Sequence, residues 1–287
     1  MHALIIGLGL IGGSIARTLK KNSDWTVSGY DINKESLDEA LKSGAIDIAW
    51  DLSTPTDADI TVLCMSPSAT VAFLRQNAVL LKKDTVVTDV CGIKEWIVKS
   101  CGDICKPLGL HFIGGHPMAG KERNGFKNSD ENLFNRASYI LTPVDTTSDK
   151  AITVAKQYVS ALRVAKITVT TPEFHDRMIA FTSQLPHIIA GAYVKSPSCL
   201  DRRGFSAGSF KDVSRVATVD ENLWSELFIK NRDALLTEID ILLAEITRYK
   251  IAIENSDMDV LKDTIKQGRL IKENDIKETD REKRNTM

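Results

Sequence analysis

The feature that most constrains the fold is a glycine-rich stretch that begins close to the start of the chain. An apolar run, Leu4-Ile5-Ile6, leads into Gly7-Leu8-Gly9-Leu10-Ile11-Gly12, and a helical pattern follows. In a dinucleotide-binding turn, the first glycine of this spacing permits the turn, the second admits the pyrophosphate and the third lets the helix pack on the strand. The stretch therefore predicts a strand, a turn and a helix, with a cofactor contacting Gly7, Leu8, Gly9, Leu10, Ile11 and Gly12.

An acidic residue stands where such a turn needs one. Residues 26–30 are typical of a second strand, and Asp31 follows this strand, 19 residues after Gly12. A carboxylate at this point accepts hydrogen bonds from the adenosine ribose hydroxyls and repels a 2′-phosphate. We therefore expect NAD rather than NADP, although Lys34 nearby would soften the repulsion.

Charge and cysteine usage limit the partners. With 37 Lys and Arg against 38 Asp and Glu, the net charge of -1 creates no overall field for nucleic acid or an anionic membrane. No stretch approaches the roughly 20 apolar residues of a membrane span, and the first apolar run lacks the charged lead of a secretory signal. Five scattered cysteines favour a reducing, cytoplasmic setting, and Cys101 and Cys105 lack the partners of a metal site. We expect a small-molecule ligand, with no nucleic acid, membrane or metal.

Strand-like and helix-like segments alternate up to about residue 170. Apolar segments occur at 59–65, 85–89, 110–113 and 166–170, and helical patterns occur at 11–21, 33–43 and 67–81. This alternation predicts an α/β fold with a doubly wound parallel sheet of the Rossmann type. Ligands bind beyond the carboxyl ends of the strands in such sheets, so Ser66 and Asp89 are expected at the cofactor.

His116 follows the strand expected at 110–113, between two glycines and a proline. Histidine has an unperturbed pKa near neutrality and can act as a general base. An isolated histidine is also commonly an exposed residue or a buried one with a satisfied hydrogen bond, and spacing alone leaves both interpretations open. Its place at the expected cofactor mouth makes it the catalytic candidate.

From about residue 171 the pattern becomes helical. Thr171-Pro172-Glu173 is typical of a helix start, and Asp176, Ser183 and His187 share one face of the helix that follows. Pro186 interrupts this helix, so we expect a kink there. The polar face and the kink together favour a pocket wall, and a packed helix whose polar side chains bond to neighbours is the alternative.

A longer helix is expected over 221–250, with Asp220 as its N-cap and an apolar stripe along one side. At 1.5 Å per residue it would be roughly 45 Å long, which favours cover by a partner subunit; packing on its own domain is the alternative. A last helix at 257–271 would precede a charged, mobile tail. The predicted division is a dinucleotide-binding domain at 1–170, an all-α substrate and dimerisation domain at 171–272, and the tail at 273–287.

Five motifs occur in the order found in one family. They are GLGLIGGS at 7–14, TDVCGIK at 88–94, GGHPMAG at 114–120, SQLPH at 183–187 and GSFKDVSR at 208–215. On these motifs the chain resembles the prephenate and arogenate dehydrogenases over residues 1 to about 250. GGHPMAG and the later FKD-x-x-R are specific to that family, whereas the glycine fingerprint is general.

The resemblance implies an NAD-dependent oxidative decarboxylation of a cyclohexadienol in tyrosine biosynthesis, by a homodimer joined through its helical domains. It implies that His116 accepts the proton of the C4 hydroxyl as hydride leaves, and that Arg215 binds a substrate carboxylate. His187 and Ser183 match positions that line the same pocket. Lys211, four residues before Arg215, would add a second positive charge for a dicarboxylate.

Two positions depart from the family pattern. Members commonly carry a serine that bonds the substrate hydroxyl or the histidine where this chain has Gly92, so a backbone amide, a water or Cys91 would substitute, or the site has one polar contact fewer. Some members carry histidine at the position of Gln184, which bears on substrate contacts. The alternatives are the same chemistry on arogenate, a dehydrogenase of β-hydroxy acids, and an NAD-sensing protein without catalysis.

Overall fold

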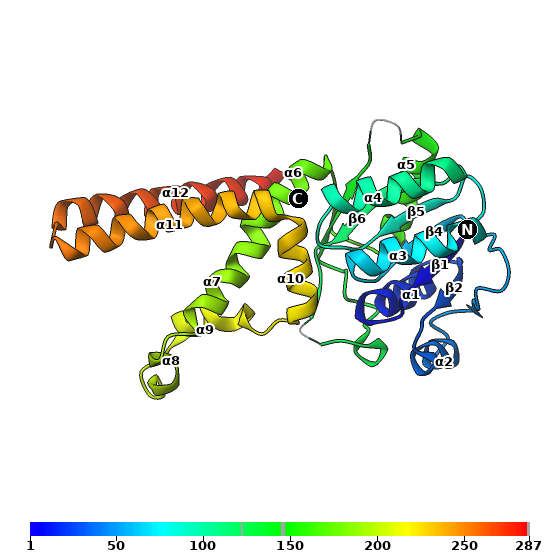
Figure 1. The fold of residues 1–287 in the computed structure, drawn as a ribbon, viewed down its shortest axis with the longest axis horizontal. Helices are drawn as coiled ribbons and strands as arrows, with labels where there is room; N and C mark the ends of the chain where they lie inside the picture. Colours follow the sequence, from blue (N-terminus) through cyan, green and yellow to red (C-terminus); the bar gives the residue numbers. More distant parts are fainter. Residues whose placement is uncertain (122, 145–146, 286–287) are drawn as a thin grey trace. The chain divides into compact units, whose positions relative to one another are not determined.

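The computed structural model describes residues 1–121, 123–144 and 147–285 (Figure 1). The chain forms two compact units, Met1–Leu235 and Leu236–Met287. The first unit holds the sheet and the helices that surround it. Within the described residues, no helix combines the length and the apolar character needed to cross a membrane.

In the described part of the first unit, eight strands form one sheet in the order β3-β2-β1-β4-β5-β6-β7-β8. The strands are β1 (His2–Ile6), β2 (Thr26–Tyr30), β3 (Ile48–Ala49), β4 (Ile60–Leu63), β5 (Val86–Asp89), β6 (His111–Pro117), β7 (Ser138–Thr142) and β8 (Lys166–Val169). Neighbouring strands run parallel, except that β6 and β7 are antiparallel. The strand order reverses between β1 and β4, which confirms the predicted doubly wound α/β fold and adds one antiparallel pair to it.

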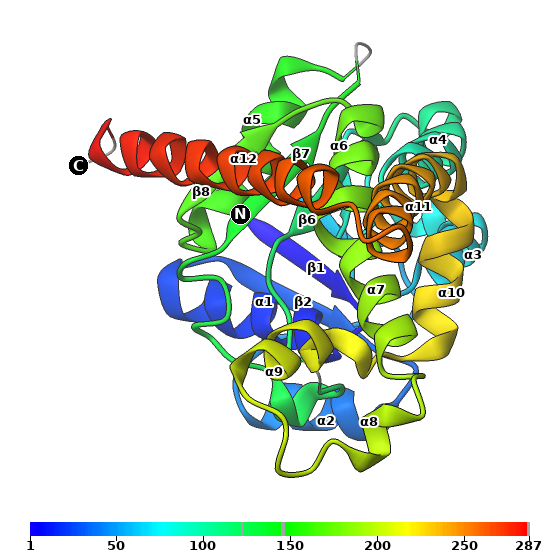
Figure 2. The same cartoon turned by 90° about the vertical axis from the view of Figure 1, so that its left-hand side faces the viewer.

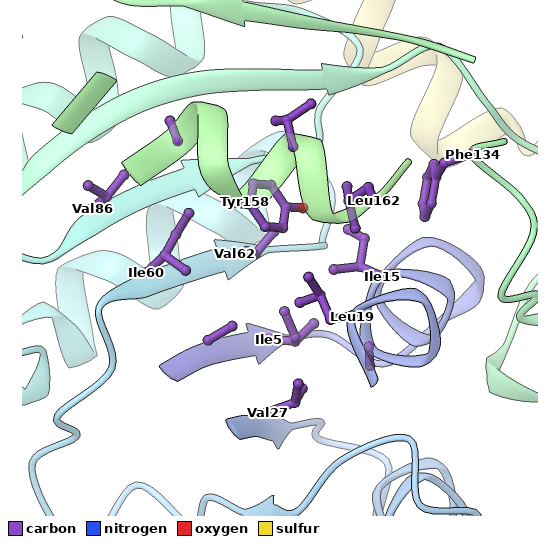
Figure 3. Packing of buried hydrophobic residues seen from close by; sticks show 14 of the residues in the cluster. Ile5, Ile15, Leu19, Val27, Ile60, Val62, Val86, Phe134, Tyr158 and Leu162 are labelled. Carbon is purple, nitrogen blue, oxygen red and sulfur yellow. The ribbon is translucent and has the colours of Figure 1, made fainter. Parts of the chain in front are cut away.

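Helices cover both faces of this sheet, because successive side chains of each strand point to opposite sides. On one face, Ile5 and Val62 pack with α1 (Leu10–Asn22) and α5 (Asp149–Ala161) (Figure 3). On the other face, Leu4 packs with α3 (Pro67–Asn77) and α4 (Glu95–Cys105). The short α2 (Lys34–Lys42) packs beside β3 and is capped by Asn33. Each fully buried large apolar side chain contributes about 1.5 to 3 kcal/mol relative to exposure, so both faces stabilise the sheet.

Strand β6 is longer than the sequence predicts, and it contains His116. Residues 111–113 pair with β5 in parallel, whereas residues 114–117 pair with β7 in the antiparallel direction. The expectation that His116 lies past the end of its strand is therefore wrong, because β7 continues the pairing beyond the end of β5. Gly115 is required here, since a Cβ would lie 2.6 Å from the carbonyl oxygen of Asp89.

The first unit continues as a series of helices. They are α6 (Pro172–Ile179), α7 (Leu185–Tyr193), α8 (Ser198–Asp201), α9 (Gly208–Ser214) and α10 (Glu221–Lys230), with a π-helical turn at Ala180–Gln184 and a 3-10 turn at Arg215–Ala217. The Thr171 hydroxyl accepts the Phe174 amide at the predicted helix start. Pro186 has no amide to donate to the Thr182 carbonyl, and the wider π-helical turn precedes it. Helix α9 and the 3-10 turn pack against α7 (Figure 2).

The long helix expected at 221–250 is interrupted. Asp220 caps α10 as predicted, with its carboxylate accepting the Leu223 amide at 2.9 Å, but α10 ends at Lys230 and α11 (Arg232–Glu254) begins after Asn231. The Asn231 side chain is buried and donates to the Asp176 carbonyl and the Gln184 side chain. Residues about fifty positions away thus hold Asn231 out of helical geometry.

The second unit consists of most of α11 and of α12 (Met258–Asn285). The expectation that the last helix ends at 271 is wrong, because the charged segment continues it. Its charges form pairs along the helix, such as Arg269 with Glu273 at 2.6 Å, which support helical geometry. The mobility expected from residue 273 onward stays a prediction, and residues 286 and 287 of the predicted tail lie outside the described residues.

Candidate active site

The glycine-rich turn has the shape that a dinucleotide needs. Gly7 has a φ of +89°, a conformation that residues with a Cβ rarely adopt, and a Cβ on Gly12 would overlap the Gly7 carbonyl oxygen. A Cβ built on Gly9 meets no atom within 4 Å. The turn therefore brings helix α1 close to β1 and leaves open space beside Gly9, at the helix N-terminus where phosphate groups bind.

Asp31 lies beside this turn, at the end of β2. One carboxylate oxygen accepts the Leu8 amide at 2.6 Å and the other accepts the Asn33 amide at 2.7 Å. These bonds fix the carboxylate, and each oxygen keeps a second acceptor position for a ribose hydroxyl. Turn and acid together fit a dinucleotide.

Asp89 occupies a different place from the one expected. Its side chain has no exposed surface, and its carboxylate accepts from the Lys94 ammonium at 2.5 Å, the Cys91 amide at 2.8 Å and the Gly115 amide at 3.0 Å. Lys94 is fully buried as well and also donates to the Ile93 carbonyl. Asp89 therefore organises the loop after β5 from beneath, without reaching a surface that a cofactor touches.

Ser66 is the N-cap residue of α3 and is half-buried at the carboxyl end of β4. Helix α10 attaches to the sheet domain next to it. The Glu226 carboxylate accepts the Ser68 amide at 2.6 Å, and the Lys230 ammonium lies 3.3 Å from the centre of the Trp96 ring. An anion at a helix N-terminus and a cation over an indole are both favourable contacts. These two contacts hold α10 against the start of α3 and against α4, next to Ser66.

His116 is half-buried and is connected to α6. Its Nδ1 lies 2.8 Å from Nε2 of His175, and Nδ1 of His175 lies 2.7 Å from Oδ1 of Asp176. The two oxygens of Asp176 also accept the amides of Lys94 and Glu95, at the start of α4. A run of three side chains thus joins the candidate base to a helix N-terminus.

The electrostatics of this run keep His116 neutral. Burial lowers the pKa of His116 well below its usual value near 6.5, and the neighbouring His175 and Lys94 lower this pKa further. Burial also lowers the pKa of His175, against the pull of the Asp176 carboxylate, which favours the charged ring. A neutral imidazole can accept a proton at physiological pH, as a general base must.

Gly92 faces both His116 and α10. A Cβ on Gly92 would lie 3.6 Å from a Leu227 methyl carbon and 4.0 Å from Cε1 of His116, which are ordinary contact distances. Cys91 does not supply the polar group of the family serine, because its Sγ lies 3.5 Å from the Met65 carbonyl oxygen and its amide donates to Asp89. Burial also raises the pKa of the Cys91 thiol well above its usual range. A serine side chain at position 92 would therefore meet the apolar side chain of Leu227 on α10.

Gln184 belongs to the scaffold. Its side chain is buried, accepts from the Asn231 amide group at 2.8 Å and donates to the Leu227 carbonyl. The departure from histidine at this position therefore concerns how the π-helical turn packs on α10.

The remaining predicted residues lie on α7 and α9 and next to them. His187 is half-buried, bonds the Ser183 carbonyl through Nδ1 at 2.7 Å and stacks on Trp224, with ring centres 3.7 Å apart. Lys211 and Arg215 are exposed, on α9 and at the start of the 3-10 turn, and both of these elements pack on α7. The structure thus groups the predicted cations with α7, which carries His187 and follows the π-helical turn that holds Ser183.

Sequence reasoning missed the side chains that contact other parts of the site. His175, Leu227 and Glu226 were assigned no role, although each contacts the sheet domain around His116 or Gly92. The one available signal was the dipeptide His175-Asp176 inside the first turns of a helix, since polar pairs in such positions often bond to groups outside the helix.

A dinucleotide turn and a neutral, half-buried histidine on the same sheet are what a dinucleotide-dependent dehydrogenase requires, because hydride transfer from an alcohol leaves a hydroxyl proton for a base. Sequence comparison narrows this class. Residues 15–168 match the nucleotide-binding domain of prephenate dehydrogenase, and residues 171–267 match its dimerization domain. The chain belongs to the prephenate dehydrogenase family.

Three relatives illustrate this membership. A cyclohexadienyl dehydrogenase of Zymomonas mobilis is 34% identical, over 93% of this chain and 93% of its own. The solved prephenate dehydrogenase of A. aeolicus, in complex with hydroxyphenyl propionate and NAD+, is 28% identical with a TM-score of 0.86, covering 96% of this chain and 98% of that one. The arogenate dehydrogenase of Synechocystis is 27% identical with a TM-score of 0.82, covering 96% and 99%.

Proposed function

We propose that the chain catalyses the NAD-dependent oxidative decarboxylation of prephenate to 4-hydroxyphenylpyruvate. The observation that carries this proposal is the neutral, half-buried His116 on β6, on the same sheet as the dinucleotide turn. Membership of the family and the likeness to an enzyme solved with NAD+ and a hydroxyphenyl compound support the same reaction.

NAD supplies a hydride acceptor, held by the turn at residues 7–12 and by Asp31. His116 accepts the proton of the C4 hydroxyl while the C4 hydride leaves, which converts the alcohol carbon to a carbonyl. The bond to the ring carboxylate then breaks, carbon dioxide departs, and its electron pair moves through the ring to the C4 oxygen. His116 returns the proton to that oxygen, so the phenol forms with no net uptake or release of a proton.

The two substrate carboxylates need cations. Arg215 presents a planar fork of donors suited to one carboxylate, and Lys211 on the adjoining helix adds charge for the second. Ser183, in the π-helical turn, and the stacked His187, on α7, are proposed to line the same pocket, with Ser66 at the cofactor. These assignments rest on the motif match and on the packing of α9 and the 3-10 turn against α7.

We also propose a division into functional domains at residue 171, a homodimer formed through the helical domain, and a cytoplasmic location. The dimer is supported by the family's dimerization domain and by large apolar side chains exposed along α11 and α12, among them Ile253 at 63% and Ile271 at 73%. All five cysteines are free thiols, which agrees with a reducing compartment.

Arogenate is the second candidate substrate, because the chain is also similar to an arogenate dehydrogenase. An NAD-binding protein without turnover is the third candidate, prompted by Gly92, where family members commonly carry a serine.

One absorbance assay of NADH formation separates these candidates. Wild-type protein is tested with prephenate, with arogenate and without substrate, each with NAD and with NADP.

His116→Asn is expected to lower kcat on prephenate by about 10²- to 10⁴-fold while NAD binding is retained. His111→Asn, at the other end of β6, is the matched control and should keep wild-type kcat. Undiminished turnover by His116→Asn would contradict the base assignment, and NAD binding without turnover on either substrate would favour the third candidate.

A further inference from the structure

The three side chains behind His116 have a defined hydrogen-bond direction. A carboxylate only accepts, and Asp176 accepts the Lys94 amide at 2.6 Å and the Glu95 amide at 2.8 Å. The contact of 2.7 Å between Oδ1 of Asp176 and Nδ1 of His175 therefore requires that Nδ1 of His175 carries a proton.

The direction passes from one ring to the next. A neutral His175 protonated at Nδ1 has a lone pair at Nε2, which lies 2.8 Å from Nδ1 of His116. His116 must then carry its own proton at Nδ1 and donate it to His175. The second nitrogen of His116, Nε2, keeps its lone pair and is the basic atom.

We propose that His175 and Asp176 are positioning residues that hold His116 in the tautomer whose Nε2 receives the substrate proton. The proposal rests on the proposed function and names the atom that performs its first step. The proposal gives His175 and Asp176 a role, although neither residue is among the proposed substrate contacts.

The surroundings of the pair agree with this role. His175 is 1% exposed and Asp176 is 2% exposed, so water does not compete for these bonds. The charged groups facing the two rings are the Asp176 carboxylate from α6, the Lys94 ammonium at the start of α4 and the Asp89 carboxylate at the end of β5. When His116 takes up a proton, His175 accepts a stronger bond from it, and Asp176 stabilises the resulting positive charge.

The pair also links the base to the packing of α6 on α4. Asp176 belongs to α6, yet its carboxylate bonds the first amides of α4. A negative charge is favourable at a helix N-terminus, so Asp176 is held in place from both sides. The Asp176 carboxylate that sets the tautomer of His116 through His175 is therefore also the group that joins α6 to α4.

The kinetic test compares two substitutions of His175. His175→Leu removes the acceptor, and kcat on prephenate should fall by about 100- to 1,000-fold while KM and the Kd of NAD change by less than about threefold. His175→Gln places an amide oxygen near the former Nε2 and should restore kcat to within about tenfold of wild type. His111→Leu is the matched control for loss of a histidine and should leave kcat unchanged. Wild-type kcat in His175→Leu, or a folded His175→Gln as impaired as His175→Leu, would overturn the proposal.

A spectroscopic test is independent of turnover. The chain has five histidines, so the ring signals of ¹⁵N-histidine-labelled protein can be assigned by single substitutions. At pH 7.5 His116 should show a protonated Nδ1 and an unprotonated Nε2, and His175→Leu should shift His116 toward protonation at Nε2. An Nε2-protonated His116 in the wild type would refute the assignment. If the wild type turns over neither substrate, the proposed function fails, and the tautomer measurement still decides the role of His175 and Asp176.

Discussion

The buried ion pair beneath the loop after β5 yields a quantitative prediction. Lys94 and Asp89 have no exposed side-chain surface, and their charged groups lie 2.5 Å apart. Lys94→Met keeps the length and much of the volume of the side chain while removing its charge. Asp89 then remains as a buried carboxylate that still accepts the backbone amides of Cys91 and Gly115 but has lost its ammonium partner.

The cost of that change follows from the burial. At an effective dielectric of 20, two charges at this separation attract by several kcal/mol, most of which offsets their desolvation. Removing one partner of a buried pair typically costs about 3 to 5 kcal/mol, because the other charge stays buried. The two amide bonds that Asp89 keeps place Lys94→Met near the lower end, at about 3 kcal/mol. Since domains are stable by about 5 to 15 kcal/mol, this loss is large.

Urea unfolding followed by tryptophan fluorescence measures the effect. Lys94→Met should lower the free energy of unfolding by about 3 kcal/mol, whereas the double variant Lys94→Met, Asp89→Asn, which removes both charges, should be more stable than the single variant. A single variant within about 1 kcal/mol of wild type, or a double variant no more stable than the single, would refute the reasoning.

Three further predictions concern the cofactor, the loop and pH. Asp31→Ala should raise the KM for NAD by about tenfold and should lower the preference for NAD over NADP, which titrations with each cofactor measure. An unchanged ratio of the KM values for NADP and NAD would contradict the assignment of Asp31 to the ribose. Gly92→Ala should change the free energy of unfolding by less than about 1 kcal/mol, because its Cβ makes only ordinary contacts. Gly115→Ala should lower the free energy of unfolding by more than about 3 kcal/mol, because its Cβ meets the Asp89 carbonyl oxygen; equal urea midpoints for the two variants would contradict this prediction. Because burial lowers the pKa of His116 and of His175, the unfolded state binds more protons, so stability should fall as pH drops below about 6.5; a melting temperature that is flat from pH 7.5 to 5.5 would contradict it.

Much of the sheet domain could be predicted because its signals are local. Periodicity, the glycine turn and the helix starts at Asn33 and Thr171 depend on neighbours in sequence. The errors arose where distant contacts decide the geometry. The residues 114–117 are rich in glycine and unlike a strand, yet β7 pairs with them. The break at Asn231 depends on bonds to Asp176 and Gln184, which no helical pattern encodes.

The site divides in the same way. The position of His116 relative to the expected strands and cofactor makes it a candidate base, and the spacing of Asp31 to the glycines makes it a candidate ribose contact; both roles stay predictions. Leu227 and His175 could not, because their importance comes from contacts with Gly92 and His116, across the fold. Asp89 is expected at the cofactor from its place at a strand end, but a carboxylate there can face the interior as well as the surface, and Asp89 is fully buried.

The double pairing of β6 has a consequence for how binding energy is used. A base carried on a flexible loop must be ordered when substrate arrives, and ordering a residue's backbone costs about 1 to 2 kcal/mol. His116 lies in a strand that pairs with β5 at one end and with β7 at the other, so its backbone is ordered when the protein folds. In the proposed mechanism, substrate binding energy is thereby left for orienting the substrate, and this sheet acts as a preorganised support for His116 as the base.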